Sequence, residues 1–231
     1  MKSIALKLYK SARDIRDFAG KAAHLQSEKQ RRSTVPIAVI DDQPFAPQTN
    51  LQSYGYNISQ IGDIKSLGEV SKYPLILCDI MGVGRHFDHK LQGASLITEL
   101  KKNYPEKIVI AYTGAALNDR AVKVAADRAD RILKKDIDID EWVDALDRAT
   151  REAVDPYIIW NKVRARFVEM GVDTKDMIAF EDAYVRSVQS RDITFSAVKA
   201  AGNDQSLRSD AKAIVNGVIS SLVFQAIFGI A

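Results

Sequence analysis

The spacing of apolar residues changes twice along the 231-residue chain. Over residues 2–27 apolar positions recur every three or four residues between Lys and Arg, which predicts an amphipathic helix. From Thr34 onward, short runs rich in Val and Ile alternate with helical stretches, the pattern of β-α units around a parallel sheet. After residue 151 only helical spacing remains. We therefore expect an α/β domain flanked by helical regions.

The α/β part predicts one doubly wound, five-stranded parallel sheet. Its strands are expected at Val35–Ile40, Asn57–Ile61, Pro74–Asp79, Lys107–Thr113 and Asp130–Leu133. Its helices are expected at Pro47–Tyr54, Ser66–Lys72, Gly93–Tyr104, Leu117–Arg128 and Asp140–Arg151. Gln26–Ser33 has no apolar period and is interpreted as a polar linker.

The C-terminal region is predicted to be entirely helical. Its first helix ends at Gly171, a residue suited to the left-handed turn that closes helices. Three further helices are predicted, one from Asp173 or Thr174, one at Ile193–Ala201 and one over Ser206–Ala231. The predicted domains are an amphipathic basic helix with its linker (1–33), an α/β domain (34–151) and an all-α output or dimerisation module (152–231).

The end of the chain is unusually apolar, because Ala213–Ala231 holds 19 residues without a charge. A helix of this length spans about 28 Å at ~1.5 Å per residue, close to the ~30 Å hydrocarbon core of a bilayer. Its polar residues, among them Asn216 and Gln225, and its marginal length favour burial over membrane insertion. Burial predicts packing inside the helical module or against a second copy of the chain, which makes a homo-oligomer the expected assembly. Peripheral membrane association stays open.

The formal net charge of +3 combines three unlike segments. Residues 1–33 carry +6, residues 34–150 carry −3 and residues 151–231 are neutral. A nucleic-acid partner is not expected, because clustered Lys and Arg occur only in the first segment. The single cysteine, Cys78, excludes an intramolecular disulfide, and the first residues lack the apolar stretch of a signal peptide. A cytoplasmic location is expected.

Charged and hydroxyl side chains occupy the ends of several predicted strands. Asp41 and Asp42 follow the first strand, Asp79 ends the third, Thr113 ends the fourth, and Lys135 follows the fifth. Ligands of open parallel sheets bind at this edge, so these side chains should converge. Three clustered carboxylates repel one another unless a hard cation bridges them, and Mg²⁺ prefers such oxygen ligands. A carboxylate, a metal, an ammonium and a hydroxyl are the parts needed for phosphoryl transfer to a carboxylate.

Residues 34–151 resemble the receiver domain of two-component response regulators, which has a flavodoxin-like fold. The matching motifs are VIDDQP, LILCDIM, IAYTG and ADRILKK, in the family's order. The resemblance implies that Asp79 is the phosphoacceptor and that Lys135 contacts the phosphoryl group, with Thr113 as the switch hydroxyl. It also implies a Mg²⁺ site made of Asp41, Asp42, Asp79 and the main-chain carbonyl of Met81.

By this resemblance, the chain is expected to be a response regulator. A sensor histidine kinase or a phosphotransfer protein would supply the phosphoryl group, and the helical module would change its contacts in response. No enzymatic activity is expected beyond self-phosphorylation from a phosphodonor and slow autodephosphorylation. The flanking helical regions resemble no output module.

The sequence also departs from the family pattern. The loop Met81–Gln92 is about six residues longer than the resemblance predicts, and it contains His86 and His89, whose spacing suits a transition metal in principle. Gly114, Asp136 and Ile132 stand where the family's switch has other residues. The residue that Ile132 replaces is an aromatic in the family. Two alternative functions therefore stay open: a receiver-like interaction scaffold without phosphorylation switching, and a membrane-acting effector that uses the apolar C-terminus.

Overall fold

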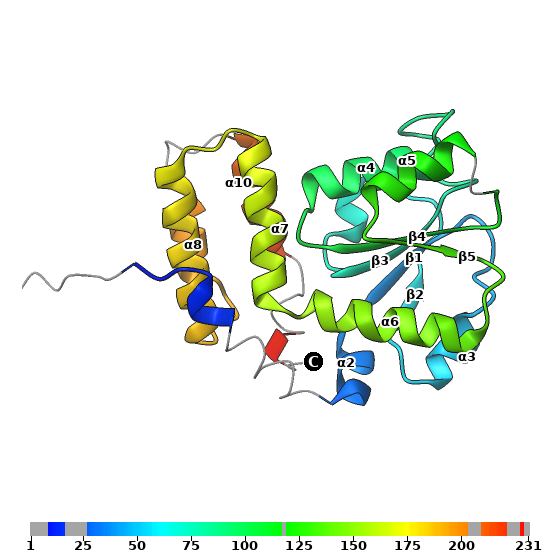
Figure 1. Cartoon of the computed structure of the whole chain (residues 1–231), viewed down its shortest axis with the longest axis horizontal. Helices are drawn as coiled ribbons and strands as arrows, with labels where there is room; N and C mark the ends of the chain where they lie inside the picture. The colour runs from blue at the N-terminus through cyan, green and yellow to red at the C-terminus, as the bar shows by residue number, and fades with distance from the viewer. Residues whose placement is uncertain (1–8, 17–26, 117–118, 203–208, 221–226, 229–231) are drawn as a thin grey trace, which may run out of the picture.

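Five strands form one all-parallel sheet, in which the three central strands are fully buried and the two edge strands are partly exposed (Figure 1). The strands are β1 (Ile37–Ile40), β2 (Ile58–Gln60), β3 (Leu75–Asp79), β4 (Ile108–Thr113) and β5 (Arg131–Lys134). Their order is β2-β1-β3-β4-β5, the flavodoxin-like order of doubly wound sheets. The predicted fold class is confirmed. The computed structural model of the chain describes residues 9–16, 27–116, 119–202, 209–220 and 227–228.

Helices cover both faces of the sheet (Figure 1). One face packs against α4 (Gly93–Asn103), α5 (Arg120–Arg128) and the short 3-10 helix η1 (Leu67–Val70). The other face packs against α3 (Gln48–Ser53) and α6 (Ile139–Ala153), with α2 (Glu28–Thr34) beside α6. Side chains alternate between the faces along each strand, so Ile76 and Cys78 lie in the first core and Leu75 and Leu77 in the second.

A helical unit continues the chain directly after α6 (Figure 1). It contains α7 (Pro156–Glu169), α8 (Thr174–Gln189), α9 (Ser196–Gly202) and α10 (Ser209–Ser220). Asp155 caps α7, and Gly171 takes the predicted left-handed conformation just after it (φ 67°). The buried side chains of Trp160 and Tyr184 stack at 5.4 Å between ring centroids. Their hydrophobic core is continuous with the core beneath α6.

The predicted helix over 2–27 is only partly tested, because residues 1–8 and 17–26 lie outside the described part of the chain. Within the described part, residues 9–11 are not helical and only 13–16 are. Tyr9 Oη donates a hydrogen bond to Glu181 Oε2 at 2.7 Å, and the main-chain N–H of Lys10 donates to Asp182 Oδ1 at 2.8 Å. This short segment therefore binds α8 of the helical unit instead of continuing as a helix.

The interpretation of Gln26–Ser33 as a linker was wrong, because Glu28–Thr34 forms α2. Ser27 caps this helix through its side chain, which accepts from the main-chain N–H of Gln30. The Arg32 guanidinium donates two hydrogen bonds to the Asp147 carboxylate on α6, at 2.8 and 2.6 Å. The helix is held by this tertiary ion pair, which the local polar pattern does not reveal.

Among the helices of the α/β domain, two more differ from the prediction in their bounds. The helix expected at Ser66–Lys72 is a single 3-10 turn, closed at its start by reciprocal hydrogen bonds between Ser66 and Glu69. Helix α5 begins at Arg120, because the Asp119 carboxylate accepts hydrogen bonds from the first main-chain N–H groups of the helix. Residues 117–118 lie outside the described part.

The apolar C-terminus is described only in part. Ala213–Ser220 belongs to α10, whose Ile214, Val215 and Val218 are buried in the core of the helical unit. This part packs within the chain, as the burial interpretation predicts. Residues 203–208, 221–226 and 229–231 lie outside the described part. Among the helices that the structure describes, none combines the length and apolarity needed to cross a bilayer.

Candidate functional site

Three carboxylates meet at the carboxyl edge of the sheet. Asp41 and Asp42 follow β1, and Asp79 ends the adjacent strand β3. One oxygen from each carboxylate lies within 4.8 Å of the other two. Asp41 and Asp79 are buried, whereas Asp42 is exposed. The strand ends thus bring together the three carboxylates that the sequence pointed to.

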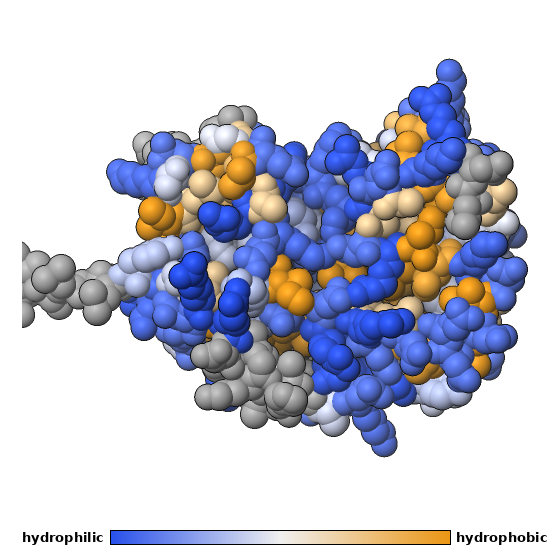
Figure 2. Space-filling model, in the orientation of Figure 1, coloured by the Kyte–Doolittle hydropathy of each residue, from blue (hydrophilic) through white to orange (hydrophobic). Residues whose placement is uncertain are grey.

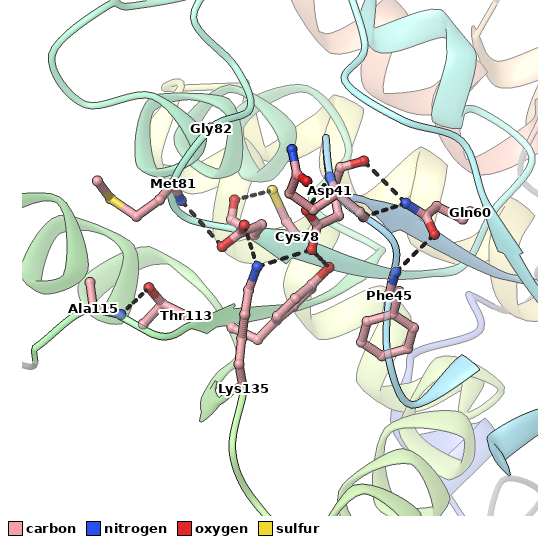
Figure 3. Close-up of polar contacts among 12 residues, drawn as sticks. Asp41, Phe45, Gln60, Cys78, Met81, Gly82, Thr113, Ala115 and Lys135 are labelled. Atoms are coloured by element: carbon pink, nitrogen blue, oxygen red, sulfur yellow. Dashed lines mark hydrogen bonds and ion pairs between the residues drawn. The ribbon is translucent and has the colours of Figure 1, made fainter. Parts of the chain in front are cut away.

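Lys135 reaches into this group from the end of β5 (Figure 3). Its Nζ donates to Asp79 Oδ2 at 2.6 Å and to Asp41 Oδ2 at 3.1 Å. The neighbouring Lys134 is exposed. When all four groups are ionised, three carboxylates and one ammonium leave an excess of two negative charges. One divalent cation would neutralise that excess.

The pKa values reflect this crowding. Burial raises the pKa of Asp79, although hydrogen bonds from Lys135 and from the main-chain N–H of Met81 oppose the effect. Burial alone would lower the pKa of Lys135, but its hydrogen bonds to Asp79 and Asp41 raise it overall. Lys135 is therefore held as a cation beside the carboxylates, and a second positive charge would favour the ionised form of Asp79.

The oxygen atoms available at the site suit a hard divalent cation. Asp41 Oδ1 accepts from the main-chain N–H of Gln43 at 2.9 Å, and its Oδ2 accepts from both Lys135 and Tyr112. A carboxylate has about four lone-pair directions, so Asp41 has little capacity left. Asp79 uses fewer of its lone pairs, and Asp42 lies at the exposed mouth of the site. The donor set fits Mg²⁺, with Asp42 and Asp79 best placed to coordinate directly.

Tyr112 supports the site in a way that the sequence did not predict. Its phenol donates to Asp41 Oδ2 at 2.8 Å, and its buried ring packs against Phe45 and Trp142 at centroid distances of 5.4 and 5.8 Å. Lys135 Nζ lies 5.3 Å from the centre of the same ring. Asp79 and Tyr112 are register partners on neighbouring parallel strands, so their side chains lie on the same face of the sheet. Side-chain alternation along the strands could have indicated this shared face, but it could not have indicated the hydrogen bond to Asp41.

Gln60 on β2 holds the loop that carries the acidic pair (Figure 3). Its Nε2 donates to the carbonyls of Asp41 and Gln43 at 3.3 and 2.6 Å, and its Oε1 accepts from the main-chain N–H of Phe45 at 3.0 Å. The loop between β1 and α3 is therefore fixed by a side chain from a neighbouring strand. Nothing local in the sequence identified Gln60.

The long loop Met81–Gln92 is ordered by its own turns. Gly82 has φ 90°, and a Cβ added there would lie 2.5 Å from Asp42 Oδ1, so glycine lets the loop pass close to the acidic pair. Gln92 Oε1 accepts from the main-chain N–H of Gly82 at 2.7 Å and ties the two ends of the loop together. A Cβ at Gly93 would meet the carbonyl oxygen of Asp79 at 2.1 Å, so α4 also starts against the site.

The remaining predicted site features lie at the margin of this group. The Thr113 hydroxyl is buried and accepts from the main-chain N–H of Ala115 at 3.0 Å (Figure 3). His86 and His89 are both exposed. Among the described residues, the three aspartates are the only group of three or more ligating side chains, so the two histidines do not complete a metal site there.

Comparison with known proteins gives matches among solved structures. No family model matches the chain, and no curated protein does. The chain is similar to a CheY-like response regulator receiver domain protein from Methanospirillum hungatei JF-1, with 20% identity and a TM-score of 0.41, over 52% of this chain and 97% of the other. A signal receiver domain of an HD domain-containing protein from Pseudomonas fluorescens Pf-5 matches with 20% identity and a TM-score of 0.42, over 51% and 95%.

A response regulator protein from Burkholderia pseudomallei, solved with a phosphorylated aspartic acid, calcium ion and citrate, also matches. It has 21% identity and a TM-score of 0.39, over 67% of this chain and 92% of the other. Two of these proteins are named as receiver domains and the third as a response regulator.

Proposed function

We propose that this protein is a response regulator, a signalling protein of the receiver class that accepts a phosphoryl group on Asp79. The proposal rests on one arrangement: Lys135 Nζ lies 2.6 Å from Asp79 Oδ2 inside a group of three carboxylates at the carboxyl edge of the sheet. Structural ion pairs neutralise charge, whereas this group keeps an excess of negative charge at a ligand-binding edge. That excess favours a phosphoacceptor site that works with a divalent cation.

Asp42, Asp79 and the main-chain carbonyl of Met81 would hold Mg²⁺, with Asp41 assisting from its buried position. When bound, Mg²⁺ supplies positive charge to the phosphoryl oxygens and brings the donor into line with the acceptor. Asp41 is fixed by Gln43, Tyr112 and Lys135. The negative charge of Asp41 attracts the cation even while the Asp41 carboxylate keeps these hydrogen bonds.

The transfer step uses the Asp79 carboxylate as the nucleophile. One of its oxygens forms a bond to phosphorus, and the bond from phosphorus to a donor histidine nitrogen breaks, with the electron pair leaving on that nitrogen. Lys135 releases its ion pair with Asp79 and donates to a phosphoryl oxygen instead. The donor would be the phosphohistidine of a sensor kinase or of a phosphotransfer protein.

The readout would pass through α6 into the helical unit. Asp41 accepts a hydrogen bond from Tyr112, whose ring contacts Trp142 on α6, and α7 follows α6 after a short turn. When Lys135 turns toward the phosphoryl group, its hydrogen bond to Asp41 Oδ2 would break as well, which leaves Tyr112 as the remaining donor to that oxygen. The helical unit then acts as the output or dimerisation module.

A receiver-like scaffold without phosphorylation switching is the second candidate. It is favoured by Ile132, which stands where the family's switch aromatic is expected, and by the Thr113 hydroxyl, which already bonds the main chain of Ala115. In this case the site holds a cation without becoming phosphorylated, and partner binding is constitutive. The two candidates differ in one measurable property, the formation of an acyl phosphate.

Incubation with acetyl phosphate and Mg²⁺, followed by intact-mass measurement, tests the proposal. We expect one phosphoryl group on the wild type, none on Asp79→Asn, and normal labelling of the exposed control Asp144→Asn. Chelation of Mg²⁺ should abolish labelling. An unlabelled wild type alongside a labelled standard receiver, or equal labelling of Asp79→Asn, would contradict phosphorylation at this site.

A further inference from the structure

A cavity of about 490 Å³ lies between the α/β domain and the helical unit. It opens where the ends of α4 and α5 face α7, in the central part of Figure 1. Figure 2 shows hydrophilic residues around the hollow between the two parts of the molecule. The lining residues that matter here are charged, among them Lys101, Arg128, Asp130, Lys162, Arg166 and Glu169. The cavity shares no residue with the carboxylate site.

Basic groups outnumber acidic groups in this lining by five to three. Two ammonium groups, Lys101 and Lys162, share the single carboxylate of Asp130. Asp130 Oδ2 accepts from Lys101 at 2.8 Å and from the main-chain N–H of Val109 at 2.7 Å, and Oδ1 accepts from Lys162. Asp130 is therefore engaged on both oxygens, and the pair of ammonium groups keeps one positive charge in excess.

The environment of Lys162 reflects this excess. Its side chain is only 22% exposed. Burial and the neighbouring charge of Lys101 lower the pKa of Lys162 to about 8, against the raising effect of Asp130 and Glu152. An additional anion in the cavity would relieve the repulsion between the two ammonium groups.

Arginine side chains complete the basic lining. Arg166 on α7 donates through Nε to the carbonyl of Lys102 at 3.2 Å and through Nη1 to Glu169 at 3.1 Å. Arg128 ends α5 and is exposed, and its side chain makes no hydrogen bond or ion pair with the described part of the chain. A guanidinium matches two oxygens of a phosphate at once, so Arg128 is the natural contact for an incoming phosphate.

We propose that this cavity binds the phosphate groups of a small, multiply charged ligand such as a phosphate ester or a diphosphate. Its volume falls within the range of ~300 to 1,000 Å³ that is typical of small-molecule sites. The lining concentrates positive charge in a concave surface, which attracts anions more strongly than scattered surface lysines do. Bound phosphate would join α4 and α5 to α7 and hold the helical unit in its position against the α/β domain.

Calorimetric titration with inorganic pyrophosphate, in EDTA without added metal, tests this site. We expect saturable binding by the wild-type chain, weakened about fivefold or more in Arg128→Gln, because a hydrogen bond between charged groups is lost. The matched control is Lys123→Gln on the same helix, an exposed residue outside the lining that removes the same charge. Its affinity should stay within about twofold of the wild type, since distant surface charges are screened.

A second variant, Lys162→Gln, should also weaken binding, and Asp79→Asn should leave it unchanged. Three results would overturn the proposal: no saturable binding at millimolar pyrophosphate, equal weakening by Lys123→Gln and Arg128→Gln, or loss of binding in Asp79→Asn. Labelling of Asp79 by acetyl phosphate is measured separately and does not use this cavity, so failure of one proposal leaves the other standing.

Discussion

Tyr112 connects the acidic site to α6, and removal of its phenol oxygen tests the contact with Asp41. In Tyr112→Phe the ring keeps its packing against Phe45 and Trp142, but Asp41 Oδ2 loses a donor. A buried hydrogen bond to a charged group contributes about 1.5 kcal/mol or more, so we expect a loss of this size in the free energy of unfolding.

Urea denaturation of Tyr112→Phe measures this loss. The control is Tyr54→Phe, at an exposed tyrosine, which should stay within about 0.5 kcal/mol of the wild type. Equal stability of Tyr112→Phe and the wild type would show that the Asp41 contact contributes nothing net.

Some residues of the site could be predicted from the sequence, and others could not, because their role depends on the fold around them. Asp41, Asp79 and Lys135 could be predicted because each stands at the end of an apolar strand, and parallel strands end at one edge. Tyr112 and Gln60 could not, because their contacts depend on which strands become neighbours and on side-chain direction. Strand order emerges only when the whole sheet is assembled.

Among the elements, the start of α9 depends on a single carboxylate. Asp192 accepts from the main-chain N–H and the hydroxyl of both Thr194 and Ser196. These hydrogen bonds, those from Ser196 first, lower the pKa of Asp192 to about 2. A depressed pKa means that the stabilisation is complete above the unfolded-state pKa of about 3.9 and is lost as the pH falls toward 2.

Asp192→Asn should therefore destabilise the protein at neutral pH, because an amide offers one acceptor oxygen where the carboxylate offers two. The difference in urea midpoint between wild type and variant should shrink as the pH falls from about 4 toward 2, since ionised Asp192 contributes only in the wild type. If the difference in urea midpoint did not change with pH, the loss of stability in Asp192→Asn would come from the altered side-chain shape and not from the lost charge. Asp144→Asn, at an exposed position, serves as the matched control.

Helices and strands were predicted correctly where burial alone determines the structure of a segment. The prediction failed where contacts with distant residues determine it. The strands β3 and β4 are runs of fully buried residues, so their apolar sequence specified them to within one or two residues. Helix α2 is polar, and its Arg32 ion pair joins a residue 115 positions away. No local window of sequence contains that partner, which is why the segment was interpreted as a linker.

For the whole molecule, the position of the helical unit depends on close contacts with the end of α4. Gly217 in α10 faces the ring of Tyr104, the residue after α4, and a Cβ at Gly217 would lie 2.9 Å from Tyr104 Cδ1. Glycine is required here by the approach of the two parts. The Tyr104 ring is half-buried and packs against the core of the α/β domain, so it cannot move aside without disturbing that packing.

Gly217→Ala brings two opposing effects together. Alanine in a helix interior is favoured over glycine by about 1 kcal/mol, whereas overpacking a close contact costs about 1 to 3 kcal/mol. Because the built Cβ contact is shorter than 3.0 Å, we expect overpacking to win and Gly217→Ala to lower the free energy of unfolding. In a Tyr104→Ala background the ring is gone, so the same substitution should become stabilising.

Urea denaturation of the four proteins in this double-mutant cycle measures the reversal of sign. If Gly217→Ala stabilises both backgrounds equally, α10 does not press on Tyr104 in solution, and the helical unit is held against the α/β domain by other contacts. If it destabilises only when Tyr104 is present, the two parts dock through this contact. In that case, the cavity between α4, α5 and α7 is bounded by a fixed interface, and phosphate bound there would act on a defined arrangement of the two parts.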